Sequence, residues 1–319
     1  MSDVPVDWST LIGHDKVRRW FSSAINQGRL GGSFLLVGAP GIGKRTVANL
    51  LAKTLLCESS DPALMQPCGT CQACVQSDAQ SHPDVVRVCK PADKTFIPLE
   101  LLIGPPDARM QEGFCRDVRL KPMQGSRKVA IMEDADFLNE EGANCLLKTL
   151  EEPPSGAIIL LIGTSEQRQL PTIRSRCQII RMGPLSSAEA AQLLRQAHGI
   201  EATDEQLEHA IQISGGDMHV AARLLDEDAD QLRQALTSQL ASESPDPVAL
   251  SRIISTHVDQ AGKEAPKRRS AMRDVFSISV QHFRAVLRQE ALDRATNPST
   301  LARLDRSVRA LREVDRSAN

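Results

Sequence analysis

The sequence contains few aromatic residues, no long apolar run and almost no net charge. Of its 319 residues, seven are Phe, two are Trp and none is Tyr. Proteins that bind single-stranded nucleic acid stack the bases on aromatic side chains, so this shortage argues against base stacking as the protein's main task. The net charge of −2 likewise provides no general positive field for nucleic acid.

The marks of a secreted or membrane protein are also missing. No apolar run reaches membrane-spanning length, and the start, MSDVPVDWST, has no basic segment followed by an apolar one. We therefore expect a cytoplasmic protein without a membrane partner. Because thiols stay reduced in that compartment, the eight cysteines are expected to bind metal or lie buried rather than form disulfides.

Apolar segments alternate with amphipathic ones in the first half of the chain. Strands are expected at 33–38, 84–88, 128–134 and 157–165, with a helix after the first and another at 139–152. This alternation predicts an α/β domain built on a parallel sheet.

After Pro184 the pattern is helical throughout. Helices are expected at 187–198, 204–214 and 218–225, and SESPDP at 242–247 has the composition of a linker. Two apolar stripes predict further helices that pack in a core or against a partner helix. The stripes are Phe276, Val280, Phe283 and Leu287, and then Leu301, Leu304, Val308 and Leu311.

The stretch GAPGIGKRT, from Gly38 to Thr46, predicts a phosphate-binding loop. It follows an apolar strand and opens a helix, as the pattern G-x-x-x-x-G-K-[ST] requires. Arg45, however, stands where a magnesium-binding hydroxyl is expected, and Thr46 comes one residue late, about 100° away on the helix. The candidate nucleotide-binding residues are Gly38, Gly41, Gly43, Lys44, Arg45 and Thr46.

Two acidic residues end the strand in VAIMEDAD. A nucleotide hydrolase uses an Asp at the end of such a strand to hold magnesium, and a neighbouring Glu to polarise water. Here the order is reversed, to Glu133 and then Asp134. The reversal and Arg45 together indicate a weak demand for catalysis, and an acidic cluster that merely ends a strand is the alternative.

Four cysteines are spaced C-x10-C-x2-C-x2-C: Cys57, Cys68, Cys71 and Cys74. Four thiolates are typical of a closed, tetrahedral structural zinc site, whereas a catalytic zinc keeps an open position. An iron–sulfur cluster uses the same ligands, and free surface cysteines are the remaining alternative.

The segment TIRSRCQ carries Arg174 and Arg176 after an apolar strand and a turn. An arginine on such a loop can reach the nucleotide of a neighbouring subunit and stabilise transition-state charge. By itself this signal is weak, since a surface salt bridge is the default interpretation.

In this order the motifs resemble the bacterial DNA polymerase III clamp-loader family of AAA+ proteins. The resemblance rests on GAPGIGK, the four cysteines, KVAIMEDAD, NCLLKTLEEPP and SRC, and it covers roughly residues 8–185. Within the family the chain is most similar to the delta-prime type, with the gamma/tau type as a near relative.

The resemblance implies three domains. These are an AAA+ α/β domain at 1–183 with a zinc insert at 57–74, a helical lid at 184–241 and a helical collar at 242–319. It also implies a five-subunit ring with gamma/tau-type and delta-type partners, which opens a sliding clamp and places it on primed DNA. In such a ring Arg176 acts on ATP held by a neighbouring gamma/tau subunit, and Thr164 takes the first sensor position.

The departures from the family fall in the chain's own nucleotide site. They are Arg45, the Glu133–Asp134 order and the missing second sensor arginine after Gly216, where only His219 is offered. We therefore expect a delta-prime-like subunit whose own ATPase site is impaired, with ATP and magnesium bound weakly or not at all. The alternatives are an active gamma/tau-type ATPase and, with less support, a separate zinc-dependent nucleic-acid binder.

Overall fold

A computed structural model describes residues 7–225, 227–242 and 246–262, together with scattered positions between 264 and 309. The chain divides into two compact units, Met1–Leu193 and Leu194–Asn319. The expected three-domain limits, 1–183, 184–241 and 242–319, stay a prediction.

The first unit is built on a five-stranded sheet in the order β2-β3-β4-β1-β5, and every neighbouring pair of strands is parallel. The strands are β1 (Gly32–Val37), β2 (Val85–Val88), β3 (Lys128–Met132), β4 (Ala157–Gly163) and β5 (Gln178–Arg181). Four of them are the expected strands: β1 is shifted by one residue, and β2, β3 and β4 are shorter than expected by one or two residues. The short strand β5 was missed by the sequence analysis.

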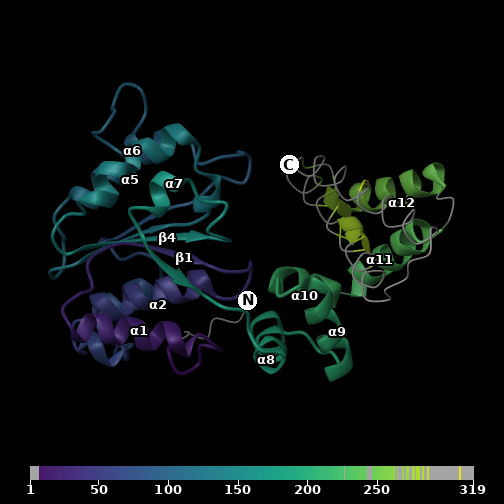
Figure 1. The fold of residues 1–319 in the computed structure, drawn as a ribbon, viewed down its shortest axis with the longest axis horizontal. Coiled ribbons are helices and arrows are strands. Elements are labelled where there is room, and N and C mark those ends of the chain that lie inside the picture. Colours follow the sequence, from purple (N-terminus) through teal and green to yellow (C-terminus); the bar gives the residue numbers. More distant parts are fainter. Residues whose placement is uncertain are drawn as a thin grey trace. The chain divides into compact units, whose positions relative to one another are not determined.

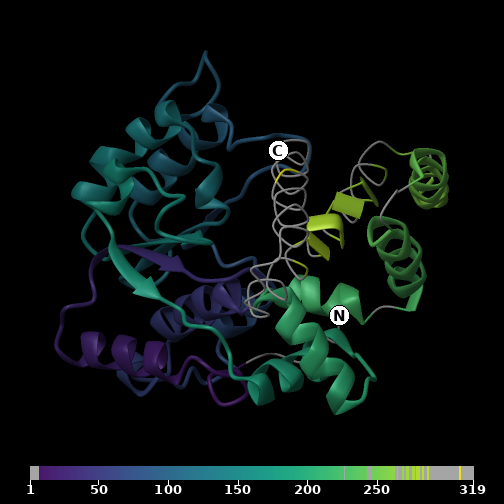
Figure 2. The same cartoon turned by 45° about the vertical axis from the view of Figure 1, so that its right-hand side comes forward.

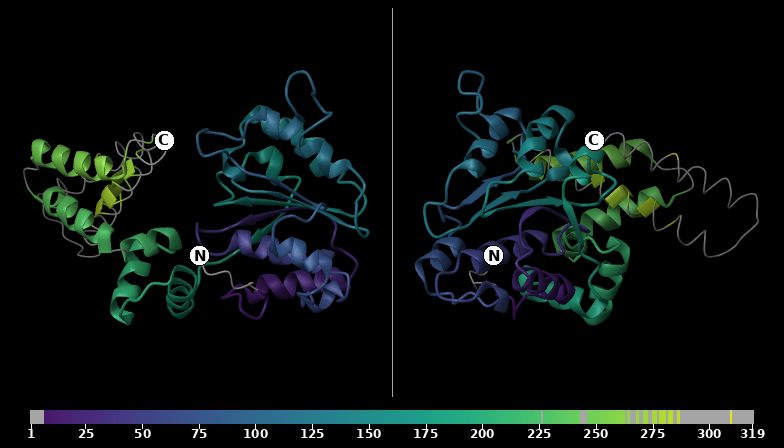
Figure 3. Two further views of the ribbon diagram at one scale, coloured as in Figure 1. Left: turned by 180° about the vertical axis from the view of Figure 1, so that it is seen from behind. Right: turned by 60° about the vertical axis from the view of Figure 1, so that its left-hand side comes forward.

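Helices cover both faces of this sheet (Figure 1), with α1 and α2 on one side and α5, α6 and α7 on the other. The same two layers are visible in the turned views of Figures 2 and 3. The helices of the first unit are α1 (Asp15–Asn26), α2 (Lys44–Leu56), α3 (Gln72–Asp78), α4 (Leu99–Ile103), α5 (Phe114–Arg119), α6 (Glu140–Glu151) and α7 (Pro171–Arg174).

The central strands are apolar on both faces because helices cover both sides. All residues of β3 and β4 are buried, and Leu35, Ile131 and Leu160 have no exposed surface. This is the near-continuous apolar pattern of a parallel sheet. The α/β fold class predicted from the sequence is confirmed.

Helix α6 shows how local sequence sets an element's limits. Asn139 caps its start, because its Oδ1 accepts a hydrogen bond from the Gly142 N–H at 2.8 Å. Ala143, Leu146 and Leu150 are buried on one face, and two prolines follow the helix at 153–154. Glu151 therefore lies at its C-terminal end, next to the turn that leads into β4.

The second unit is helical over the residues described. Helix α8 (Ser187–His198) leads into it, and α9 (Asp204–Ser214), α10 (Met218–Leu224), α11 (Glu227–Leu240) and α12 (Pro247–Gln260) follow. Helices α8 to α10 match the expected ranges to within a residue. Thr203 and Gln206 form a capping box at the start of α9.

A small apolar cluster joins α11 and α12, which lie side by side (Figure 1). Its buried members are Leu232, Leu236 and Val275. The predicted stripe residues Phe276, Val280 and Phe283 are half-buried. Leu287 and the second stripe, Leu301, Leu304, Val308 and Leu311, lie outside the described residues.

Candidate nucleotide and metal sites

The phosphate loop follows the C-terminal end of β1 and leads into α2, as predicted. Gly41 and Gly43 have φ of 76° and 99°, a region that favours glycine. At Gly38, a Cβ atom would lie 2.5 Å from the carbonyl oxygen of Met182, so a side chain there would force the loop away from the strand. The glycines thus hold the loop against the sheet edge.

Lys44 begins helix α2, and its residue is only 8% exposed. Its Nζ donates to the loop carbonyls of Gly38 and Ala39 at 2.7 and 2.6 Å. The ammonium group therefore lies inside the loop. Gly43, the N-cap of α2, provides no side chain to cap the helix. The first amides of α2 face the loop, as in a phosphate-binding helix start.

Arg45 forms an ion pair with Glu133 at the end of β3. Its Nε donates to Glu133 Oε2 at 2.6 Å, and Nη2 meets the same oxygen. The Arg45 side chain is 65% exposed and that of Glu133 14%. The hydrogen bond to Glu133 raises the pKa of Arg45. The structure thus joins the two positions at which the sequence departs from the nucleotide-hydrolase pattern.

A magnesium ion does not fit this arrangement. In a working phosphate-loop site, the hydroxyl after the lysine and the acid at the strand end both help to hold the ion. Magnesium needs oxygen ligands at about 2.0–2.1 Å in an octahedron, and a guanidinium has no acceptor atom. Here the guanidinium is in direct contact with the one acid that would ligate. We derive no catalytic step through magnesium in this chain.

Asp134 stands where a hydrolase has its water-polarising Glu. Its backbone is left-handed, with φ of 56°. Although Asp134 is exposed, partial desolvation of its carboxyl group, together with the neighbouring Glu133, raises its pKa. Thr46 is half-buried in the first turn of α2. The roles expected for both residues stay predictions.

Thr164, the expected first sensor, follows β4 and is tied to an acid that the sequence analysis did not select. Its backbone N–H donates to Asp136 Oδ2 at 2.8 Å, and Gln169 Nε2 meets Asp136 Oδ1. The Oγ1 atom of Thr164 is buried without a protein partner. Asp136 is the last acid of EDAD, so its place in the motif was the signal that could have identified it.

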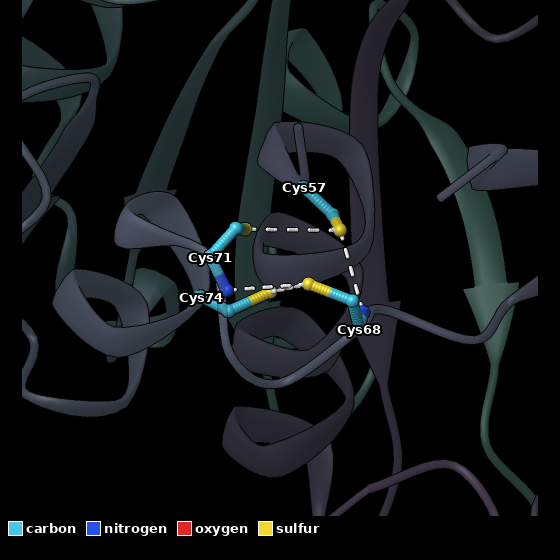
Figure 4. A group of neighbouring side chains, drawn as sticks. All are labelled: Cys57, Cys68, Cys71 and Cys74. Carbon is cyan, nitrogen blue, oxygen red and sulfur yellow. Dashed lines mark hydrogen bonds between the residues drawn. The ribbon is translucent and has the colours of Figure 1, made fainter. Parts of the chain in front are cut away.

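The four predicted metal ligands come together at the other end of helix α2 (Figure 4). Cys57 ends α2, while Cys71 precedes α3 and Cys74 lies within it. The ligand atoms of the four cysteines lie within 4.8 Å of one another. The sulfur atoms are 4.0 Å apart for Cys57 and Cys71, and 3.9 Å apart for Cys68 and Cys74.

These distances fit a tetrahedral zinc ion. Zinc–sulfur bonds of about 2.3 Å place neighbouring sulfur atoms roughly 3.8 Å apart in a tetrahedron. Backbone N–H groups already point at the sulfurs, from Cys68 to Cys57 Sγ and from Cys71 to Cys68 Sγ, both at 3.3 Å. Backbone hydrogen bonds from Thr70 and Cys71 lower the pKa of Cys68 to about 5. The donor set is closed, so a bound zinc would hold the loop together.

An ion pair joins α2 to α3, the helix that carries Cys74 of the cysteine knuckle (residues 57–74). Lys53 Nζ contacts both oxygens of Asp78, at 2.8 and 2.6 Å, although the Lys53 residue is only 6% exposed. On the same helix, Trp8 Nε1 donates to Thr54 Oγ1 at 2.8 Å. Helix α2 therefore carries a rigid support for the knuckle.

Arg176 lies just after α7, and its guanidinium rests on its own chain. Nε donates to Glu151 Oε1 at 2.5 Å, and Nη1 donates to Thr172 O at 3.0 Å and to Ser175 Oγ at 3.2 Å. The side chain of Arg176 is 28% exposed and that of Glu151 47%. Arg174, by contrast, is exposed. The sequence analysis missed Glu151, although it stands in LEEPP.

The fold and these sites define a class: a phosphate-loop α/β protein with a cysteine knuckle inserted after helix α2. Residues 13–186 match the model of the family described as DNA polymerase III, delta subunit. The chain belongs to this family.

Several curated relatives share the same region. The chain is 39% identical over 193 residues to DNA polymerase III subunit delta' of Pseudomonas aeruginosa, a match of 60% of this chain and 55% of that protein. It is 28% identical to subunit delta' of Escherichia coli, over 72% of this chain and 65% of that protein. Subunit tau of Salmonella typhimurium is 30% identical, over 73% of this chain and 32% of that protein.

The match therefore spans about half the length of the first of these relatives. A solved structure of a DNA polymerase III gamma subunit-related protein from Thermotoga maritima covers 91% of this chain and 90% of its own, at 17% identity and a TM-score of 0.45. Among the described residues, no helix is long and apolar enough to cross a membrane.

Proposed function

We propose that this chain is a delta-prime-type subunit of a DNA polymerase III clamp loader. In this role it joins gamma/tau-type and delta-type subunits in a five-membered ring that loads the sliding clamp onto primed DNA. It provides Arg176 to the ATP of a neighbouring subunit, and it holds one structural zinc. Its own phosphate loop does not drive the ring.

One observation supports this division of labour above others. The chain has an arginine just after α7, while at its own magnesium position Arg45 and Glu133 form an ion pair with each other. A subunit with these two features can act on a neighbour's nucleotide without hydrolysing its own. The relatives named delta' agree with this proposal.

The chemistry of Arg176 fits a role in a neighbour's site. A guanidinium keeps its charge at all physiological pH values and offers a planar fork to phosphate oxygens. Its contact with Glu151 is partly exposed, and such pairs are worth only about 0–1 kcal/mol. A triphosphate at a subunit boundary would therefore compete successfully for the guanidinium.

The test uses the reconstituted clamp loader with primed DNA and clamp. Arg176→Ala should slow ATP hydrolysis and clamp loading without changing assembly. Arginine fingers in other systems contribute about 10³–10⁵ in rate, and we expect a smaller loss here because the other sites keep their own fingers. Arg176→Lys should rescue poorly, because an ammonium lacks the fork.

Two control variants make this test specific. Arg174→Ala removes an exposed arginine two residues away and should leave the rate unchanged. Lys44→Ala disables this chain's own loop and should have little effect on loading. If Lys44→Ala abolished loading while Arg176→Ala had no effect, the chain would be a working ATPase instead.

A gamma/tau-type ATPase is the second candidate. It is favoured by the glycine loop, by the position of Lys44 inside that loop and by the tau relatives. Turnover by the isolated chain at about 1 s⁻¹ or more, the range of ordinary enzymes, would decide for it.

A further inference from the structure

The phosphate loop keeps its glycines and its lysine, yet its magnesium position is occupied by a side chain. Lys44 and the start of α2 remain arranged as in a polyphosphate site. Residue 45 and the acid at the end of β3 would normally share an ion. Here they contact each other directly.

We infer that Arg45, held by Glu133, takes the place of the divalent ion, so that this loop binds the metal-free polyphosphate of a nucleotide in preference to its magnesium complex. The inference deepens the proposed function, since it assigns a ligand form to the subunit's own loop. It does not depend on Arg176.

The geometry of Arg45 suits such a substitution. Nε and Nη2 face Glu133, which leaves the N–H groups of Nη1 for a phosphate oxygen. The side chain is held at its guanidinium end and is 65% exposed, so an anion can approach it. Hydrogen bonds from a charged guanidinium to phosphate are strong, and the N–H groups that Glu133 leaves are enough for one such contact.

The surrounding charges lead to the same conclusion. Arg87 on β2 hydrogen-bonds Asn49 Oδ1 through Nη1 at 2.7 Å. Its guanidinium interacts electrostatically with both Glu133 and Arg45. Arg45 is thus paired directly with the carboxylate, and the charge of Arg87 is close enough to be felt by both groups. A divalent cation entering here would meet two positive charges and a carboxylate already neutralised, whereas a metal-free triphosphate would meet net positive charge.

The experiment measures ATP binding to the isolated full-length chain by calorimetry, once with excess EDTA and once with excess magnesium. The wild type should bind ATP at least as tightly in EDTA as in magnesium. Arg45→Thr restores the hydroxyl and frees Glu133, so the order should reverse. Metal-free binding should weaken about tenfold, and magnesium should strengthen binding by a similar factor.

Further variants separate the guanidinium from general effects of mutation. Glu133→Gln should keep metal-free binding without gaining a response to magnesium, because Arg45 remains. Arg116→Thr is the matched control and should behave as wild type. Arg116 is an exposed arginine paired with Asp117 on α5, across the sheet from α2 (Figure 1). Thermal unfolding followed by circular dichroism verifies that each variant is folded.

Three results would overturn the inference. They are a wild type whose binding is strengthened tenfold by magnesium, a wild type that binds ATP in neither condition, and a folded Arg45→Thr variant that ignores magnesium. A failure here leaves the Arg176 experiment untouched. Conversely, a silent Arg176→Ala variant in the assembled ring does not affect this measurement.

Discussion

Each end of helix α2 carries a site of a kind that usually binds a metal, and the two sites differ in whether the metal-binding side chains are available. At the C-terminal end, Cys57 joins three other cysteines whose sulfur atoms already lie at distances suited to zinc. At the N-terminal end, the phosphate loop precedes Lys44, and Arg45 contacts the acid that would hold magnesium. One site brings all four of its cysteines together, and at the other an ion pair joins the two residues expected at the magnesium position.

The difference shows which part of the nucleotide fold is retained when hydrolysis is not required. The knuckle and the glycine loop shape the domain, since both fix where α2 begins and ends against the sheet. The magnesium ligands serve the nucleotide and its hydrolysis, not the shape of the domain. The proposed subunit, which would act through its arginine loop, needs the shape of the domain but not hydrolysis at its own loop, and the two ends of α2 agree with that proposal.

The largest expected effect is a loss of zinc from the cysteine knuckle at the C-terminal end of α2. Cys68→Ser should remove most of the bound zinc, about one ion per chain in the wild type, because a structural site depends on all four ligands. The sheet should stay folded. Metal analysis after dialysis against a mild chelator measures the loss, and circular dichroism follows the fold.

Cys89→Ser is the control for that variant, since Cys89 is exposed and outside the cluster. A reduced wild-type preparation without zinc would contradict the prediction. Iron together with visible absorbance would identify an iron–sulfur cluster instead.

A smaller effect is expected from the brace between α2 and α3. Lys53→Met keeps most of the side-chain volume but leaves Asp78 without its partner. Because Asp78 is partly exposed, 38% at its side chain, we expect a loss of about 1–2 kcal/mol in the free energy of unfolding. Urea denaturation measures it, and zinc should leave the variant faster than the wild type. Lys16→Met, at an exposed position on α1, should change neither quantity.

The smallest effect is expected on ATP turnover at the phosphate loop, at the N-terminal end of α2. Since Arg45 and Glu133 leave no place for magnesium, the isolated chain should show negligible ATP turnover, and Lys44→Ala should not lower it further. A coupled assay for released phosphate measures both proteins. Turnover that Lys44→Ala abolished would show that both ends of α2 are working sites, and the comparison would fail.

Much of the fold was predictable because its determinants are local. Four strands were recognised as apolar runs, and α8 to α10 from the helical pattern that follows Pro184. Strand β5 was missed because Gln178–Arg181 is only four residues long and has exposed residues at both ends. It becomes a strand by pairing with β1, which no local pattern reveals. Helix α4 was missed because it is only five residues long and lies inside a stretch rich in proline and glycine.

By itself the sequence determined the chemical groups. They are four thiols at knuckle spacing, a glycine loop with a lysine, a Glu–Asp pair in reversed order, and the arginine of SRC. These follow from residue type and spacing, which the chain carries whatever its shape. Only the tertiary structure decided the partners. Arg45 and Glu133 are 88 positions apart, and Arg176 and Glu151 are 25 apart. The first pair meets at the edge of the sheet where the parallel strands end. The second pair meets because helix α6 ends beside a turn.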